Sequence, residues 1–367
     1  MVRVILVAGA RPNFMKIAPL MRAAGKVGDI DYTLVHTGQH YDYEMSQAFF
    51  DDLGMGKPDY FLNAGSGSHA EQTASIMLAF EKVCLECRPD WVLVVGDVNS
   101  TLACAIVAKK LLINVAHVEA GLRSFDRTMP EEINRLVTDS ISDLCFVTER
   151  SGEENLLKEN HPESQVHFVG HVMIDNLLYQ KEVLEGVDAS AFAHAGSKPE
   201  TGPYAFMTLH RPANVDTAAN LRSIIEAIGV VAEKMPVIFP VHPRTRKKID
   251  EFGMTLPGNI VQLPPLGFRE SLWFWKDAQV VFTDSGGLQE ETTALRIPCV
   301  TIRENTERPV TVEVGSNVLS GISTESILAA YAQALEKGKT GRIPDKWDGK
   351  ASERIWKILK EFQAGQA

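Results

Sequence analysis

The 367-residue sequence has few cysteines, no long apolar run and no excess of basic residues. Its five cysteines, an odd number scattered along the chain, do not form a disulfide framework. Cys84 and Cys87 make one CxxC pair inside a predicted helix. Because neither a second pair nor histidines at zinc spacing accompany them, we interpret both as helix residues in the core. We therefore expect no metal site.

Charge and hydropathy argue against two further kinds of partner. A formal net charge of −10 is unfavourable for nucleic acid or an anionic membrane, because both require a positive field. No apolar run approaches the length that crosses a bilayer, and the apolar start at residues 4–8 is too short for a signal peptide. We expect a cytoplasmic protein without a nucleic-acid or membrane partner.

Strand and helix patterns alternate along the whole chain. Apolar runs at residues 2–8 and 91–95 predict buried strands, and residues 14–24 have apolar positions at helical spacing. A stretch rich in Ala, Gly, Pro and Ser at 186–203 is predicted to separate the domains, and a second alternating series starts at residue 205. A chain this long exceeds one typical core. Each half is therefore predicted to form its own doubly wound parallel α/β sheet.

The turn Ser285-Gly286-Gly287 lies between a predicted buried strand and a helix. Two glycines let backbone approach a ligand closely, and a helix N-terminus offers unpaired N–H donors and partial positive charge. Glu291, one helical turn further, is suited to accept hydrogen bonds from a ribose diol. The turn predicts a nucleotide phosphate site, with an ordinary βα turn as the alternative.

A second candidate anion site follows the first strand, where Arg11 and Lys16 lie one turn apart near a helix start. The first strand of the second half ends in His210-Arg211-Pro212-Ala213-Asn214, which parallels Ala10-Arg11-Pro12-Asn13. Two sheets that face each other would bring both turns to one cleft. A solvated pair of surface cations is the alternative for Arg11 and Lys16.

Carboxylates follow two strands of the first half. Asp97 follows the strand at 91–95 after Gly96, and Glu119 comes directly after the strand at 113–118. Open parallel sheets bind ligands along this edge. A helix from residue 130 is predicted to place Glu131 and Arg135 on one face and apolar residues on the other, and an internal Glu131–Arg135 pair is the alternative to a catalytic role.

Residues 65–70 resemble a dinucleotide fingerprint, but no strong strand precedes them, so we predict a loop and no cofactor.

With these motifs assembled, the sequence resembles the non-hydrolysing UDP-N-acetylglucosamine 2-epimerases over nearly its whole length. The matching segments are 9–12 with Lys16, 37–40, 96–97, 117–123, 130–135, 240–242, 283–291 and 306–309. The resemblance implies two Rossmann-like doubly wound α/β domains facing a cleft, which is the glycosyltransferase B-type fold, and usually a homodimer. The first domain would be 1–171 with the C-terminal helix 352–367, and the second, UDP-binding domain would be 172–351.

The resemblance also implies roles for single residues. The UDP-sugar substrate would be bound by Arg11, Lys16, Ser285, Gly286, Gly287, Glu291 and Arg308. Asp97, Glu119 and Glu131 match residues implicated in proton transfer at C2 of the sugar. His210 matches a residue near the diphosphate and completes the expected catalytic set. Gln39, Gln72 and His242 fall where some bacterial members bind a second UDP-N-acetylglucosamine as an activator.

The chemistry of the implied reaction explains this layout. The C2 proton of an N-acetylhexosamine is not adjacent to a carbonyl, so departure of UDP from C1 must assist its removal and leaves 2-acetamidoglucal. Return of a proton on the opposite face and re-addition of UDP invert C2 without a cofactor. Residues 210–216 and 266–272 differ from better-known members, which leaves open a UDP-diacetamido uronic acid as the sugar. A hydrolysing epimerase, a B-type-fold glycosyltransferase and a non-catalytic sugar-nucleotide sensor are also consistent with the sequence.

Overall fold

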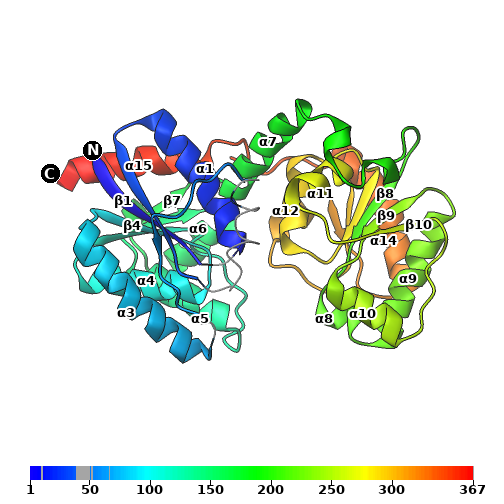
Figure 1. The fold of residues 1–367 in the computed structure, drawn as a ribbon, viewed down its shortest axis with the longest axis horizontal. Coiled ribbons are helices and arrows are strands. Elements are labelled where there is room, and N and C mark those ends of the chain that lie inside the picture. The colour runs from blue at the N-terminus through cyan, green and yellow to red at the C-terminus, as the bar shows by residue number, and fades with distance from the viewer. Residues whose placement is uncertain (10, 39–49, 51–52, 66, 367) are drawn as a thin grey trace. The chain divides into compact units, whose positions relative to one another are not determined.

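The computed structural model describes residues 1–9, 11–38, 50, 53–65 and 67–366. The chain divides into two compact units, one formed by Met1–Leu178 with Asp345–Ala367 and the other by Tyr179–Pro344 (Figure 1). The division falls inside α7 (Val172–Glu185) rather than before it. The first half of this helix belongs to the first unit because Asn176 accepts a hydrogen bond from Arg22 (2.7 Å), and Asp175 accepts one from Ser352 N (2.7 Å).

The first unit contains a parallel sheet of seven strands in its described part, in the order β3-β2-β1-β4-β5-β6-β7. The strands are β1 Val2–Ala8, β2 Ile30–His36, β3 Tyr60–Phe61, β4 Trp91–Val95, β5 Asn114–Val118, β6 Leu144–Val147 and β7 Val166–Phe168. All five residues of β4 are buried, as expected for a central parallel strand covered on both faces. The order reverses between β1 and β4, and ligands bind at such switch points in open parallel sheets.

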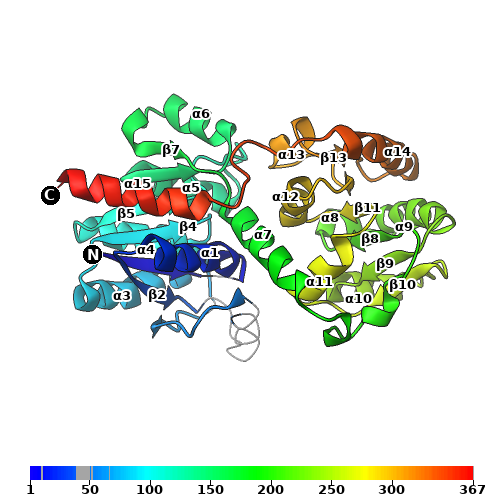
Figure 2. The same cartoon turned by 90° about the horizontal axis from the view of Figure 1, so that it is seen from above.

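Helices cover both faces of this sheet. They are α1 Arg11–Val27, α3 His69–Cys87, α4 Asn99–Lys110, α5 Pro130–Ile141, α6 Arg150–Lys158 and α15 Ala351–Gln366, with the short η1 Glu163–Gln165. In Figure 1, α3, α4 and α5 form one layer, and α1 and α15 lie on the opposite face. The C-terminal helix runs along the first unit (Figure 2), where Trp356 Nε1 donates to Leu20 O at 2.8 Å.

The second unit repeats the architecture with a parallel sheet that has six strands in its described residues, ordered β10-β9-β8-β11-β12-β13. The strands are β8 Ala205–Thr208, β9 Val237–Pro240, β10 Ile260–Leu263, β11 Val280–Thr283, β12 Cys299–Thr301 and β13 Asn317–Leu319. The helices are α8 Pro212–Val215, α9 Ala218–Ala232, α10 Pro243–Glu251, α11 Phe268–Trp275, α12 Gly286–Ala294, α13 Pro309–Glu313 and α14 Thr324–Thr340. The predicted fold class, two doubly wound parallel α/β units, is confirmed.

The stretch 186–203 does not separate the units, although its composition predicts a linker. It forms η2 (Ala189–Ala191) and η3 (Ala195–Ser197) within the second unit. His194 N donates to Glu270 at 2.9 Å, and Lys198 Nζ donates to Asp277 at 2.7 Å, so the segment is fixed to α11 and the residues that follow it. In the part of the chain that the structure describes, no helix is long and apolar enough to span a membrane.

Candidate active site

Asp97 and Glu119 lie at adjoining strand ends of the first unit, as predicted. Val95, the last residue of β4, pairs with Val118, the last residue of β5; Glu119 follows directly, and Asp97 follows after Gly96. Glu119 has a φ of +71°, a left-handed conformation that is unfavourable for a non-glycine residue and is typical of functional sites.

Lys16 reaches this strand edge from α1 and forms an ion pair with Glu119 Oε2, with both side chains buried. Gly96, with a φ of +69°, makes room for the lysine, because a Cβ there would lie 2.9 Å from Lys16 Nζ. Lys16 is therefore not a solvated surface cation. The structure places it directly on one of the predicted catalytic carboxylates. The side chain of Arg11 lies outside what the structure describes.

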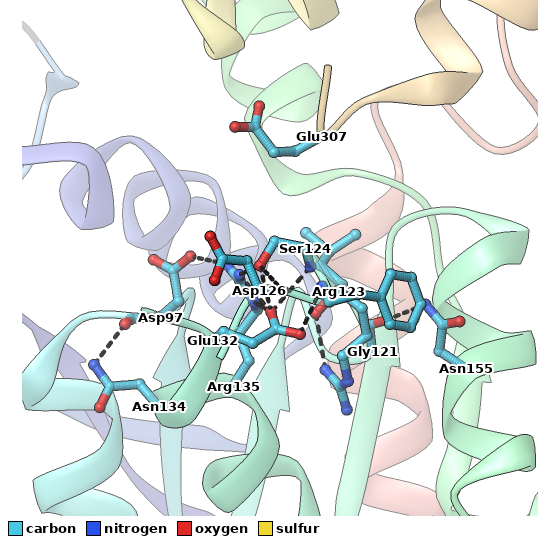
Figure 3. Close-up of polar contacts among 12 residues, drawn as sticks. Asp97, Gly121, Arg123, Ser124, Asp126, Glu132, Asn134, Arg135, Asn155 and Glu307 are labelled. Carbon is cyan, nitrogen blue, oxygen red and sulfur yellow. Dashed lines mark hydrogen bonds and ion pairs between the residues drawn. The ribbon is translucent and has the colours of Figure 1, made fainter. Parts of the chain in front are cut away.

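Arg135 pairs with Asp97 and Glu132 rather than with Glu131 (Figure 3). Its Nη1 lies 2.5 Å from Asp97 Oδ2, and its Nη2 lies 2.6 Å from Glu132 Oε2. Glu132 also accepts hydrogen bonds from the backbone N–H groups of Ser124 and Phe125, both at 3.0 Å. Glu132 thus anchors the loop after β5, a role that the sequence did not reveal. Glu131 is exposed in the first turn of α5.

The α5 helix buries mainly its polar face. Polar residues of the helix are buried, namely Glu132, Asn134, Thr138 and Asp139, whereas Ile133 and Val137 are 42% and 36% exposed. The polar face turns inward because partners from the strand ends satisfy it, so burial costs these groups little.

Asp139 is fully buried beneath the strand ends and joins three segments of chain. His117 of β5 contacts its Oδ1 through Nδ1 (2.6 Å), and the other ring nitrogen lies 2.8 Å from Gly96 O. Gly121 N donates to Oδ2 at 3.0 Å, and Arg123 Nη2 lies 2.7 Å from the same oxygen. Burial alone would raise the pKa of Asp139, but His117 and Arg123 outweigh it and lower the pKa below its ordinary value. The carboxylate is therefore an anion that fixes the turns after both β4 and β5.

A chain of amide hydrogen bonds connects Gln72 with the Asp97 turn. Gln72 Oε1 accepts from Asn99 Nδ2 at 2.7 Å, and Asn99 Oδ1 accepts from Asn134 Nδ2 at 3.3 Å. Asn134 Nδ2 also donates to Asp97 O at 2.8 Å. Gln72, which was predicted as a possible activator contact, is thus connected to a predicted catalytic turn through two side chains. Gln39, predicted with it, lies outside the described residues.

In the second unit the predicted phosphate turn forms the start of α12. Ser285 caps the helix, and its hydroxyl accepts from Leu288 N at 3.5 Å. Gly286 and Gly287 are the first helical residues. A Cβ built at Gly286 would meet no heavy atom within 4 Å, so the space beside this residue is open. Open space next to a helix N-terminus is what close approach of a phosphate requires.

Asp284, the residue before the predicted phosphate turn, accepts hydrogen bonds from the segment after β8, whose sequence parallels the one after β1. Its buried carboxylate accepts from His210 N (2.9 Å), Arg211 N (2.8 Å) and Asn214 Nδ2 (3.1 Å). His210 Nδ1 lies 2.8 Å from Asp284 Oδ1. The pKa of Asp284 is below its ordinary value, since contacts with His210 outweigh the burial that would raise it. Asp284 was not predicted as a site residue, although a charged residue at the end of a buried strand was a usable signal.

The ring of His242 lies beside that of His210, with 5.6 Å between the ring centroids. Burial and then the neighbouring His210 lower the pKa of His242. The sequence assigned these two histidines to different functions, a catalytic one and an activator site. The structure places the two rings side by side, and His210 contacts Asp284.

Arg308 and Glu291 lie on either side of Glu290. Arg308 Nε is 2.5 Å from Glu290 Oε1, so the predicted phosphate-binding arginine is held against α12. Glu291 is buried one turn into the helix, and burial followed by the negative charge of Glu290 raises its pKa to about 8. Near neutral pH its carboxyl group is protonated and can both donate and accept hydrogen bonds, as recognition of a diol requires.

Within the described ranges no group of three or more histidine, cysteine, aspartate or glutamate side chains could hold a metal ion.

Comparison with known proteins identifies the family. A family model described as UDP-N-acetylglucosamine 2-epimerase matches residues 22–360. The UDP-N-acetylglucosamine 2-epimerase of Methanocaldococcus jannaschii is 43% identical over 360 residues, which cover 96% of this chain and 98% of that protein. A UDP-2,3-diacetamido-2,3-dideoxy-D-glucuronate 2-epimerase of Pseudomonas aeruginosa is 38% identical, over 98% and 100% of the two chains. The crystal structure of the M. jannaschii epimerase in complex with UDP-GlcNAc and UDP has a TM-score of 0.84 at 42% identity, with 98% and 100% coverage. The chain belongs to the UDP-N-acetylglucosamine 2-epimerase family, as its motifs predict.

The raised pKa of Glu291 predicts a dependence of stability on pH. In the folded chain Glu291 keeps its proton up to about pH 8, whereas in the unfolded chain its pKa is the ordinary 4.5. The stability that this proton contributes is complete below pH 4.5 and is lost as the pH rises through 8. Glu291→Gln removes this loss. We expect the free energy of unfolding of the wild type to fall relative to the variant between about pH 5 and about pH 8, by a few kcal/mol at most. Denaturant unfolding at a series of pH values measures it.

The control for this experiment is Glu325→Gln, which changes an exposed glutamate of the same unit. It should retain the wild-type slope of stability against pH. Parallel stability curves for the wild type and Glu291→Gln would contradict the raised pKa.

Proposed function

We propose that the protein catalyses the reversible C2 epimerisation of UDP-N-acetylglucosamine to UDP-N-acetylmannosamine, through elimination of UDP and a 2-acetamidoglucal intermediate. The observation that carries the proposal is the pair of carboxylates at adjoining strand ends, each held by its own cation. Asp97 is paired with Arg135, and Glu119 is paired with Lys16. The family membership supplies the substrate class, because relatives that cover nearly the whole chain carry the name of this activity.

The two carboxylates differ in a way that suits two proton transfers. The Asp97 side chain is 36% exposed, whereas that of Glu119 is 3% exposed, so solvent reaches one and not the other. Inversion at C2 needs a group on each face of the sugar, because the proton leaves from one face and returns to the other. Asp97 and Glu119 are proposed for these two roles. Glu131, which is exposed at the start of α5, is proposed as a further acid or base that contacts the bound substrate.

The UDP moiety is proposed to bind the second unit. Ser285, Gly286 and Gly287 would receive the diphosphate at the start of α12, where the space beside Gly286 is open. Glu291 would bind the ribose, and Arg308 and Arg11 would offset the phosphate charge. His210 would lie near the diphosphate and protonate or orient the departing UDP. The scheme transfers no electrons and needs no nicotinamide or metal.

The identity of the sugar is the finer part of the proposal. A relative named for a diacetamido glucuronate substrate shares 38% identity, and a uronic acid would need an additional cation for its carboxylate. Three cations at this strand edge have carboxylate partners: Lys16 has Glu119, Arg135 has Asp97 and Glu132, and Arg123 has Asp139 and Glu159. This pairing favours an uncharged hexosamine, and direct competition between the two UDP sugars decides the question.

A homodimer is proposed on the α3–α4–α5 layer of the first unit. This layer presents Leu78, Ile133 and Val137 to solvent, with exposed fractions of 68%, 42% and 36%. Apolar side chains gathered on neighbouring helices are typical of a covered surface. A second copy of the chain can present the same residues in return, as a twofold interface requires. The proposal also explains why α5 turns these residues outward.

Two variants separate the proposed roles of the units. Asp97→Asn should lower kcat by about 10²- to 10⁴-fold, the range typical of a general acid or base, and leave the affinity for UDP unchanged.

Gly286→Val should weaken UDP binding by more than about tenfold, because side-chain atoms would fill the space proposed for phosphate. Turnover is measured by separating the UDP sugars by chromatography, and UDP affinity by titration calorimetry.

Gly258→Val is the control for Gly286→Val, since a Cβ at either glycine meets no heavy atom within 4 Å. It should bind UDP as the wild type does. Near-normal turnover of Asp97→Asn would remove Asp97 from the mechanism, and unchanged UDP affinity of folded Gly286→Val would remove the α12 start from the binding site.

The dimer proposal predicts that Leu78→Asp separates the subunits, because a charge would be buried on both sides of the interface. Light scattering on a sizing column should give a mass near 81 kDa for the wild type, twice the chain mass of 40.5 kDa, and one chain mass for the variant. Leu157→Asp, which changes a 40% exposed leucine of α6 outside this layer, should remain dimeric. A monomeric wild type would refute the proposal.

A further inference from the structure

His171 is a buried histidine beside Glu119 to which the proposed mechanism gives no role. It lies between β7 and α7, is 2% exposed, and places Nε2 4.0 Å from Glu119 Oε1. Its Nδ1 accepts a hydrogen bond from Met173 N at 3.2 Å. An Nδ1 that accepts leaves the ring proton on Nε2 in the neutral tautomer, so the N–H group lies on the ring nitrogen nearer the carboxylate.

The backbone on either side of His171 is held by residues 345–354, the C-terminal return, with which the chain re-enters the first unit. Gly170 has a φ of +92°, and a Cβ there would lie 2.1 Å from Lys346 O, so the two backbones are in close contact. Arg354 Nη1 donates to Val169 O at 3.0 Å. The ring of His171 meets Trp347 edge-on, with the centroids 5.4 Å apart, and Trp347 Nε1 donates to Thr148 O at 3.3 Å. The position of the imidazole is therefore determined by residues from the far end of the sequence.

We infer that His171 is a positioning residue for Glu119. Lys16 holds Oε2 of this carboxylate from α1, and the ring N–H of His171 faces Oε1 from the start of α7, so both oxygens are directed by separate elements. At 4.0 Å the contact of His171 with Oε1 is longer than a hydrogen bond, and contacts of catalytic groups that are long in the free enzyme often shorten when substrate binds. The inference rests on the proposed role of Glu119 in proton transfer.

The C-terminal return explains why His171 can serve this purpose. Asp175, one turn further along α7, accepts from Ala351 N at 3.1 Å and from Ser352 N at 2.7 Å, which fixes the start of α15. The start of α7, the return segment and α15 are thus one connected assembly, and the imidazole is the part of it that meets the catalytic carboxylate. A side chain that is held on both sides loses little further freedom when it orients a neighbour.

The first test reads the tautomer of His171 and does not depend on turnover. Histidine-labelled full-length protein gives long-range proton–nitrogen NMR spectra in which His171 is assigned from the signals lost in His171→Gln. The inference predicts the Nε2-protonated tautomer, and a change of the Nε2 resonance in Glu119→Gln but not in Glu313→Gln, a change in the second unit. An Nδ1-protonated ring, or a ring that does not respond to Glu119→Gln, would overturn it.

The second test compares His171→Leu, which removes the donor, with His171→Gln, which retains an N–H group. We expect His171→Leu to lower kcat on the order of tenfold to hundredfold, as loss of an outer partner of a functional group does elsewhere, with KM within about twofold. His171→Gln should recover most of this loss. His167→Leu, which changes the neighbouring histidine on β7, should keep the wild-type kcat.

Two outcomes of the kinetic comparison would refute the positioning role. These are wild-type kcat in His171→Leu, and an equal loss in His171→Leu and His171→Gln. A wild-type protein without turnover on UDP-N-acetylglucosamine would instead refute the proposed function, and the NMR experiment would still decide whether His171 directs its N–H group at Glu119.

Discussion

The buried carboxylate of Asp139 is the contact on which the geometry of the first unit depends. It accepts from the Gly121 backbone and pairs with His117, which in turn reaches Gly96 O, so one side chain on α5 fixes the turns after both β4 and β5. Removal of a partner from such a network leaves a buried charge uncompensated, which costs about 3–5 kcal/mol. Asp97 and Glu119 can therefore hold defined positions although both lie in turns.

Asp284 has the same function in the second unit. Its carboxylate accepts two backbone N–H groups from the turn after β8 and contacts the His210 ring, immediately before the turn that starts α12. In both units a buried aspartate with a lowered pKa connects neighbouring strand ends. The turns proposed to bind the substrate are thereby held by charge-assisted hydrogen bonds, and such preorganisation lets donors stabilise developing charge without rearrangement.

The sequence predicted those features that depend on neighbours along the chain. The alternation of strands and helices, the turn at Ser285 between a strand and a helix, and the positions of Asp97 and Glu119 after their strands follow from local pattern, and the structure has them where expected. Glu132, Asp139, Asp284 and His171 were missed because their partners are distant in sequence or lie on other elements. The inward polar face of α5 was missed for the same reason: an amphipathic pattern shows that two faces differ, but not which one finds partners.

Removal of the C2 proton of a UDP sugar by a carboxylate of the first unit can be followed by proton NMR in deuterated water. The purified protein is incubated with UDP-N-acetylglucosamine alone, and the sugar signals are followed. The account predicts UDP-N-acetylmannosamine that carries deuterium at C2, together with gradual deuteration of the starting sugar. UDP-N-acetylmannosamine that retains protium at C2, or no conversion at all, would contradict it.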